Sequence, residues 1–362
     1  MTRWLTTTLL AFSILAAKPV FAQAPTSPPP GAQGQEQVYT IKQFRFESGR
    51  TMDDMKVGYV TFGQLNADKS NAILLVPGTS SLRHWADNYI GSGKTYDTDK
   101  YFVVSVDAIG GGTSSQPKDG LGASFPSYTI RDEVRAQHEM VSAGLGLDHL
   151  LAVAGPSMGS FQGVEWGVTY PGFAHGLVLI VPAARSDNHF KSMVDGMVAL
   201  ITLDPGYQDG KYTTNPTEGI RRAGTLYFPW LYSDAYLETL KTPETYQKAL
   251  WAFGDAWAST WDTNAIILRY KASREHDASV PYGGNMNTAL ARITVPVLML
   301  VSLTDRTIPS YLSRELYAGL RDVRWAEIPT IRGHLGGASP PPDSPDYLFI
   351  TAQVRPFLDS LR

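Results

Sequence analysis

The 362-residue chain contains no cysteine, and this absence removes several chemistries at once. Without thiols there is no disulfide, no thiolate nucleophile, no iron–sulfur cluster and no cysteine-based zinc site. Histidine is scarce, at seven residues, and no His-Glu-x-x-His or comparable spacing indicates a metal site. Gly110-Gly111-Gly112 lacks the G-x-G-x-x-G spacing of a dinucleotide site. We therefore expect neither a metal nor any other cofactor.

The chain has no surplus of positive charge either. It has 31 Lys and Arg against 34 Asp and Glu, a net charge of −3, and no long run of either sign. Because a nucleic-acid partner requires a basic face, we expect none. Hydrophobic residues make up 43% of the chain, which is enough for a sizeable core and excludes disorder over most of its length.

Long apolar runs are missing except near the N-terminus. Arg3 precedes an apolar run at residues 9–17, and Val20-Phe21-Ala22 places small or modest residues before a cleavage point. The run is too short for the ~30 Å hydrocarbon core of a bilayer. We expect residues 1–22 to be a cleaved signal peptide, and the Pro-, Gly- and Gln-rich residues 23–36 to be a flexible leader. The mature protein would then be exported, periplasmic or secreted, without a membrane span.

The strands expected in the rest of the chain have two kinds of pattern. Val38–Phe46 and Lys56–Phe62 alternate, which is typical of an antiparallel pair. Later runs are continuously apolar, which is typical of parallel strands covered on both faces by helices. These runs are 72–76, 101–106, 150–154, 176–181 and 297–301. Helix-like segments lie between several of them, so the sequence predicts an α/β fold with a mostly parallel, doubly wound sheet.

Residues 186–287 interrupt this alternation of strands and helices, because they are rich in Trp, Tyr and Met and have a helical pattern. We expect it to be a lid inserted into a core of residues 37–185 and 288–362, above the carboxyl ends of the strands. Each of the lid tryptophans 230, 251, 257 and 261 is, taken alone, more typical of ordinary helix packing than of a binding site.

The segment Gly155-Pro156-Ser157-Met158-Gly159 is a G-x-S-x-G motif that follows a strand and precedes a helix. This context is the one that a nucleophile elbow requires, because flanking glycines let strand and helix backbones pass closely around a strained serine. Ser157 is therefore the predicted nucleophile.

A serine nucleophile needs a base, and the base needs an orienting carboxylate. Asp305 follows the apolar run at 297–301, and His334 follows a last strand expected at 324–328. Their order after Ser157 is that of α/β-hydrolase triads. The oxyanion hole is expected to use the backbone N–H groups of Met158 and of Thr79, which lies in the loop after an early strand.

Several segments together resemble the homoserine O-acetyltransferase (MetX-like) branch of the α/β-hydrolases. They are Ile90–Lys94, Asp97–Val103, Phe125-Pro126, Thr129–Asp132, Val134–Gln137, Gly155–Gly159, Glu165-Trp166, Tyr170-Pro171, Asp262–Ala265 and Glu275–Asp277. The resemblance covers residues 56–185 and 290–338. It implies an α/β-hydrolase fold, the triad Ser157, Asp305 and His334, a helical lid and a homodimer formed through lid helices.

The chain departs from that branch where the acyl acceptor would bind. The acetyltransferases carry an Asp directly after the catalytic His, which holds the substrate amine, whereas this chain has Leu335. Their lid also offers an Arg for the substrate carboxylate and a Tyr seven residues later. The resemblance indicates Arg221 (or its neighbour Arg222), but seven residues on is Phe228, with Tyr227 adjacent. We treat Arg221, Tyr227 and Leu335 as candidate substrate contacts.

These departures favour water over homoserine as the acceptor. A buried ammonium without its carboxylate costs roughly a few kcal/mol of binding, and acetyl-CoA is a cytoplasmic metabolite that an exported enzyme does not meet. We expect an exported serine hydrolase that cleaves small-molecule carboxylic esters with short or medium acyl groups. The alternatives are a homoserine O-acetyltransferase-type enzyme that uses acetyl-CoA, and a non-catalytic binding protein on the same scaffold.

Overall fold

The computed structural model describes residues 34–362. The expected signal peptide and residues 23–33 of the expected leader lie outside this range. Gln35 and Glu36, which were assigned to the leader, instead begin the first strand, where they pair with Thr61 and Val60. The leader prediction was wrong for these two residues, because the composition of a segment does not reveal that it pairs with another strand.

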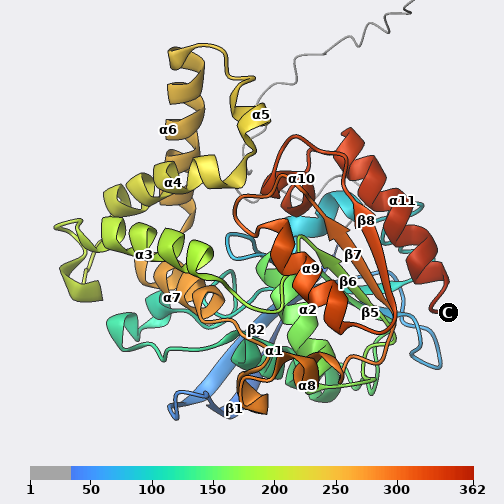
Figure 1. The fold of residues 1–362 in the computed structure, drawn as a ribbon. Helices are drawn as coiled ribbons and strands as arrows, with labels where there is room; N and C mark the ends of the chain where they lie inside the picture. The colour runs from blue at the N-terminus through green and yellow to red at the C-terminus, as the bar shows by residue number, and fades with distance from the viewer. Residues whose placement is uncertain (1–33) are drawn as a thin grey trace, which may run out of the picture.

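Eight strands form one sheet (Figure 1). They are β1 (Gln35–Arg45), β2 (Thr51–Phe62), β3 (Ala72–Leu75), β4 (Phe102–Val106), β5 (Ala152–Pro156), β6 (Leu177–Ile180), β7 (Val297–Val301) and β8 (Val323–Glu327). Their order is β1-β2-β4-β3-β5-β6-β7-β8, with β1, β2 and β4 paired antiparallel and all later pairs parallel. Every residue of β3, β5, β6 and β7 is buried, which explains their continuously apolar sequences. The predicted doubly wound, mostly parallel sheet is confirmed.

Helices cover both faces of this sheet. Those outside the inserted segment are η1 (Arg83–Tyr89), η2 (Pro117–Asp119), η3 (Gly122–Ser124), α1 (Ile130–Glu139), η4 (Met140–Gly144), α2 (Met158–Thr169), α8 (Met286–Leu290), α9 (Ser310–Gly319), α10 (His334–Ala338) and α11 (Pro345–Asp359). Successive residues of β3 show the two sides. Leu74 packs in a cluster with Val134 of α1 and Phe161 of α2, whereas Ile73 packs in a second cluster with Val354 of α11. The sheet is therefore the middle of three layers.

Between β6 and β7 the described chain forms helices and no strand. Besides α8, they are α3 (Asn188–Thr202), η5 (Gln208–Gly210), α4 (Thr217–Leu231), α5 (Asp234–Leu237), α6 (Pro243–Thr260), α7 (Thr263–Arg274) and η6 (Val280–Tyr282). Helices α3, α4, α6 and α7 share an apolar cluster that also includes Leu335, and α4–α6 rise away from the sheet (Figure 1). The expected lid boundary at residue 287 falls inside α8, whose Ala289 and Leu290 pack in the core. No helix within residues 34–362 combines the length and apolarity needed to cross a membrane.

Candidate active site

Ser157 lies on the sharp turn between β5 and α2, with φ of 57° and ψ of −122°. A positive φ is strained for a residue with a Cβ and is the expected conformation of a nucleophile elbow. The glycines on either side are required: a Cβ added to Gly155 or to Gly159 would lie 2.5 Å from the carbonyl oxygen of Val76. The motif thus encodes a close passage of backbones that presents the Ser157 hydroxyl at the end of β5.

A continuous hydrogen-bonded chain joins Ser157, His334 and Asp305. The distance from His334 Nε2 to Ser157 Oγ is 2.9 Å, and that from His334 Nδ1 to Asp305 Oδ2 is 2.6 Å. Because an ionised carboxylate only accepts hydrogen bonds, Nδ1–H donates to Asp305 and Nε2 is free to accept from the serine hydroxyl. All three side chains are buried, with exposures of 9% or less. The arrangement is able to take the proton from Ser157 and to stabilise the resulting imidazolium.

The three residues meet because each follows a strand that ends at the same edge of the sheet. Ser157 follows β5, Asp305 follows β7, and His334 follows β8 at the start of α10. Asp305 is further fixed by its other oxygen, Oδ1, which accepts the backbone N–H groups of Thr307 and Ile308 at 2.8 and 2.9 Å. This leaves Oδ2 directed at the imidazole.

The two backbone groups expected in the oxyanion hole lie beside the nucleophile. Met158 directly follows Ser157, and Thr79 lies in the loop after β3. That loop is close to the elbow, since a Cβ added to Gly78 would be 3.6 Å from Ser157 Cβ. Within residues 34–362, neither the Thr79 nor the Met158 N–H donates a hydrogen bond to another group. Both donors are therefore available to an oxyanion.

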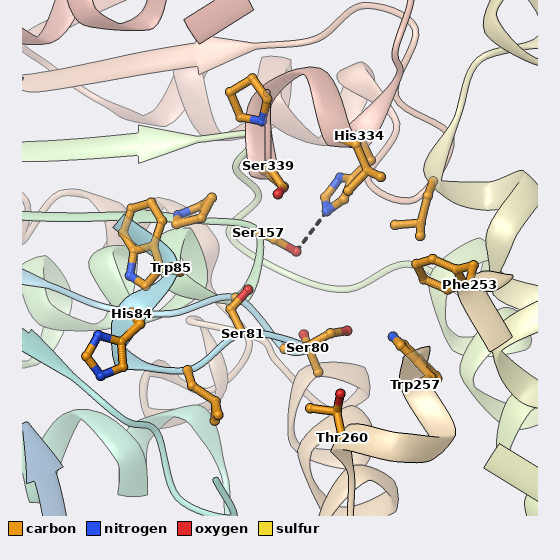
Figure 2. A pocket seen from close by; sticks show the side chains of 18 of the residues that line it. Ser80, Ser81, His84, Trp85, Ser157, Phe253, Trp257, Thr260, His334 and Ser339 are labelled. Atoms are coloured by element: carbon orange, nitrogen blue, oxygen red, sulfur yellow. Dashed lines mark hydrogen bonds between the residues drawn. The ribbon is translucent and has the colours of Figure 1, made fainter. Parts of the chain in front are cut away.

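A pocket opens over Ser157 between the core and the lid (Figure 2). Loop residues Gly78–Leu82 and the triad residues Ser157 and His334 form its inner side. The lid supplies a second side made of Tyr227, Leu231, Phe253, Trp257, Thr260 and Trp261, and the remaining lining comes from His84, Trp85, Asn88, Pro156, Leu335 and Ala338–Pro342. None of these residues is Asp, Glu, Lys or Arg. The pocket therefore suits a substrate without a formal charge.

Two of the three candidate substrate contacts line this pocket, and one does not. Tyr227 and Leu335 are both buried in the lining. Arg221 instead forms an ion pair with Asp255 at 2.5 Å, and its guanidinium lies 4.5 Å from the centre of the Trp251 ring. The assignment of Arg221 was wrong because its partners lie along the neighbouring face of α6, outside the pocket.

Sequence reasoning missed most of the lid side of the pocket. Phe253, Trp257 and Trp261 line it together, although each of the two tryptophans was taken as ordinary packing. Their spacing of four residues places them on one face of α6 and its C-terminal end, and this spacing could have indicated that they line one pocket. The same spacing is equally typical of a helix buried in a core. Pro340–Pro342 also line the pocket.

His84 is the second histidine in the lining, at the side of Trp85 (Figure 2). Its Nδ1 lies 3.0 Å from Asp87 Oδ2, and its Nε2 lies 2.9 Å from Glu36 Oε1. The hydrogen bond with Asp87 raises the pKa of His84. Any positive charge on this ring is matched by two carboxylates, so it offers little to an anionic substrate. Among the described residues, no group of three or more His, Asp or Glu side chains is placed to hold a metal ion.

Comparison with known proteins adds two kinds of relative. Residues 71–330 match the family model for the alpha/beta hydrolase fold. The homoserine O-succinyltransferase of Aromatoleum aromaticum is 30% identical over 346 residues, covering 84% of this chain and 92% of that protein. An acetylester hydrolase from Corynebacterium glutamicum superposes with a TM-score of 0.82 at 26% identity, covering 90% of this chain and 95% of that one. A homoserine O-acetyltransferase from Bacillus anthracis superposes with a TM-score of 0.81 at 25% identity, covering 90% and 98%. The relatives therefore include both hydrolases and acyltransferases.

Proposed function

We propose, from the premise that this chain belongs to the homoserine O-acetyltransferase-like branch of the α/β-hydrolase family, that it is an exported serine hydrolase of uncharged carboxylic esters. The observation that carries this proposal is the chain of hydrogen bonds through Ser157, His334 and Asp305. It lies under a pocket whose lining contains no Asp, Glu, Lys or Arg side chain. The ester would carry a short or medium acyl group.

In this mechanism Ser157 Oγ attacks the ester carbonyl while its proton passes to His334 Nε2. Asp305 holds Nδ1–H and so keeps the imidazole in the tautomer that accepts this proton. The N–H groups of Thr79 and Met158 stabilise the oxyanion of the tetrahedral intermediate. His334 then gives its proton to the leaving alcohol, which releases it and leaves an acyl group on Ser157. A water molecule, deprotonated by His334, hydrolyses that acyl-enzyme and frees the acid.

The lining of the pocket favours water over homoserine as the acceptor. Homoserine carries an ammonium and a carboxylate, and both would need partners once buried. Leu335 stands next to the triad histidine, and Arg221 is directed to Asp255, so neither partner is supplied by the candidates that the family suggests. Transfer to homoserine is the second candidate function, which the curated acyltransferase relatives support.

The test is a pair of assays on the purified mature chain. The first measures hydrolysis of p-nitrophenyl acetate, butyrate and octanoate, and the second measures CoA release from acetyl-CoA with homoserine. We expect ester hydrolysis without homoserine-dependent CoA release. Ser157→Ala should lower kcat by about 10⁴-fold or more, as loss of a serine nucleophile does elsewhere. Ser259→Ala, at an exposed lid serine, is the matched control and should leave kcat unchanged.

Each other result points to a different function. Homoserine-dependent CoA release would make the chain an acyltransferase, with an acceptor site built differently from that of its relatives. Full hydrolysis by Ser157→Ala would remove the triad from the mechanism. No activity in either assay would support the binding-protein alternative.

Export and assembly are parts of the same proposal that depend on other observations. Export rests on residues 1–22 alone, and we expect the intact mass of protein purified from its native host to begin after Ala22. Retention of Met1 would contradict it. A homodimer through the lid is implied by the family resemblance, and light scattering of the mature chain should give twice the monomer mass.

A further inference from the structure

Arg269, on lid helix α7, is a fully buried arginine without an acidic partner. Its exposed fraction is 0%, and among residues 34–362 no carboxylate lies within ion-pair distance of it. A buried guanidinium is costly unless its N–H groups are satisfied. Because an apolar side chain would fill this position without that cost, the buried guanidinium of Arg269 indicates a role other than packing.

Three of the five hydrogen bonds that Arg269 donates go to one loop. Nε donates to the carbonyl of Thr79 at 2.7 Å, and Nη2 donates to the carbonyls of Gly78 and Ser81, each at 3.0 Å. Nη1 donates to the carbonyls of Ala108 and Ile109 at 3.4 and 3.2 Å, beyond the end of β4. The loop after β3, which carries the proposed oxyanion donor, is thus held by charge-assisted hydrogen bonds from the lid.

Two neighbours on α7 hold the same loop through its side chains. The Tyr270 hydroxyl lies 2.8 Å from Ser80 Oγ, and Ser273 Oγ lies 3.2 Å from Thr79 Oγ1. Residues 269, 270 and 273 lie on adjacent positions of one helix face. These contacts make α7 the support of the loop, with Arg269 the residue that contacts its backbone.

The carbonyl contacts decide where the N–H groups of the loop point. A trans peptide is planar, with its C=O and N–H on opposite sides. Because the Gly78 carbonyl faces Arg269, the N–H of Thr79, in the same peptide unit, points away from Arg269. That N–H is one of the two free donors beside Ser157. The Gly78 carbonyl also accepts the Ser81 N–H at 3.1 Å. Arg269 and this turn together therefore set the direction of the N–H group that would bind the oxyanion.

We propose that Arg269 is a positioning residue that holds the Gly78–Ser81 loop so that the Thr79 N–H is aimed at the developing oxyanion on the substrate of Ser157. This inference rests on the proposed hydrolase function. It also makes the lid part of the catalytic apparatus, since moving α7 would turn the peptide units of the oxyanion hole.

Arg269→Met tests the proposal, because it keeps the length of the side chain and removes its five donors. Loss of one oxyanion donor costs about 10²–10³ in kcat, and misdirecting one should cost about 10–100-fold. We expect that fall in kcat per titrated active site for p-nitrophenyl acetate, with KM within about threefold. Phosphonylation of Ser157 by a fluorophosphonate should slow by the same factor, because its phosphoryl oxygen occupies the same hole.

Two further variants separate positioning from stability. Arg269→Lys keeps the charge and part of the donor set, so its kcat should lie between those of Arg269→Met and the parent. Arg274→Met, on the same helix but paired at the surface with Asp195, should leave kcat unchanged. The midpoint of the kcat/KM pH profile should be unchanged in every variant, since the triad itself is not altered.

The outcomes distinguish this inference from the function beneath it. Unchanged kcat and phosphonylation rate in folded Arg269→Met would overturn the positioning role while leaving the hydrolase intact. If that variant does not fold, full kcat in Arg269→Lys would overturn it equally. Hydrolysis that survives Ser157→Ala would overturn the proposed function instead.

Discussion

The two sides of the pocket are built on different principles. The core side is made by backbone: a strained turn at Ser157, glycines packed against the Val76 carbonyl, and free N–H groups at Thr79 and Met158. The lid side is made by side chains, with the Tyr227 ring 5.4 Å from the Trp257 ring. The backbone contacts of the core side tolerate almost no substitution, whereas the shape of the lid side changes with each aromatic side chain that is replaced. We therefore expect substitutions on the core side to change the rate of the reaction, and substitutions of the aromatic lid residues to change which substrate is accepted.

Among changes to residues other than the nucleophile, Asp305→Asn should have the largest effect, because it acts only on the core side. An amide can donate to Nδ1, which would favour the imidazole tautomer that cannot accept the Ser157 proton. The corresponding change in a Ser-His-Asp protease lowers kcat by about 10⁴-fold, and we expect a similar fall here with KM little changed. Hydrolysis of p-nitrophenyl acetate measures it. Circular dichroism provides the control for folding, and a silent variant would place the orienting acid elsewhere.

Leu335→Asp should have a smaller effect, because it places a charge where the two sides meet. A carboxylate buried at this position of the lining is poorly solvated, so we expect kcat/KM for p-nitrophenyl butyrate to fall about tenfold. Leu335→Met, which conserves volume, should stay within about threefold.

The same variant also tests the argument about the acceptor. We expect no homoserine-dependent CoA release from Leu335→Asp, because the pocket would still lack a cation for the homoserine carboxylate. Appearance of that activity would show that one carboxylate beside the triad is enough to convert the acceptor site.

Trp257→Ala should change selectivity more than rate. Removing the indole enlarges the lid side, so kcat/KM for the octanoate ester should rise about tenfold relative to the acetate, within the range that a few methylene groups provide in an apolar pocket. Trp251→Ala is the matched control, since this residue lies on the same helix α6 but outside the lining. An equal change for all three acyl lengths would show that Trp257 supports the fold and does not determine substrate size.

The contrast between the two sides also explains what could be predicted from sequence. Ser157, Asp305 and His334 could be predicted to lie together because each follows a strand that the sequence indicates, and parallel strands end at a common edge. The elbow was found because its glycine spacing is a steric requirement. These signals are local, and the geometry of the sheet converts them into a three-dimensional arrangement without further information.

The lid lacked such signals. Aromatic residues at helical spacing are equally typical of a packed core, so Phe253, Trp257 and Trp261 were not distinguished from packing residues. Arg221 was assigned by its place in the family pattern, but its direction depends on Asp255, a contact between two helices. The contacts of Arg269 with Gly78 and Thr79 join segments far apart in the chain, and no local pattern encodes them.

The smallest predicted effect is on the thermal stability of the protein and concerns Glu133, a buried carboxyl in the core. Glu133 of α1 is buried, and neither of its carboxyl oxygens has a hydrogen-bond partner within residues 34–362. Burial raises the pKa of Glu133 from 4.5 to about 8. Between these values the native state keeps the proton and the unfolded state loses it, so this carboxyl destabilises the fold progressively as pH rises.

Glu133→Gln should remove that pH dependence, because an amide remains neutral. The Tm of the variant should match the parent near pH 4.5, rise above it through pH 6 and 7, and keep a constant advantage above about pH 8. Thermal unfolding followed by circular dichroism across this range measures the difference. Glu238→Gln, at an exposed lid residue, should show no such growth. A Glu133→Gln difference that shrank with rising pH would mean that the native state holds this carboxyl ionised, with Arg269 stabilising it across the interior.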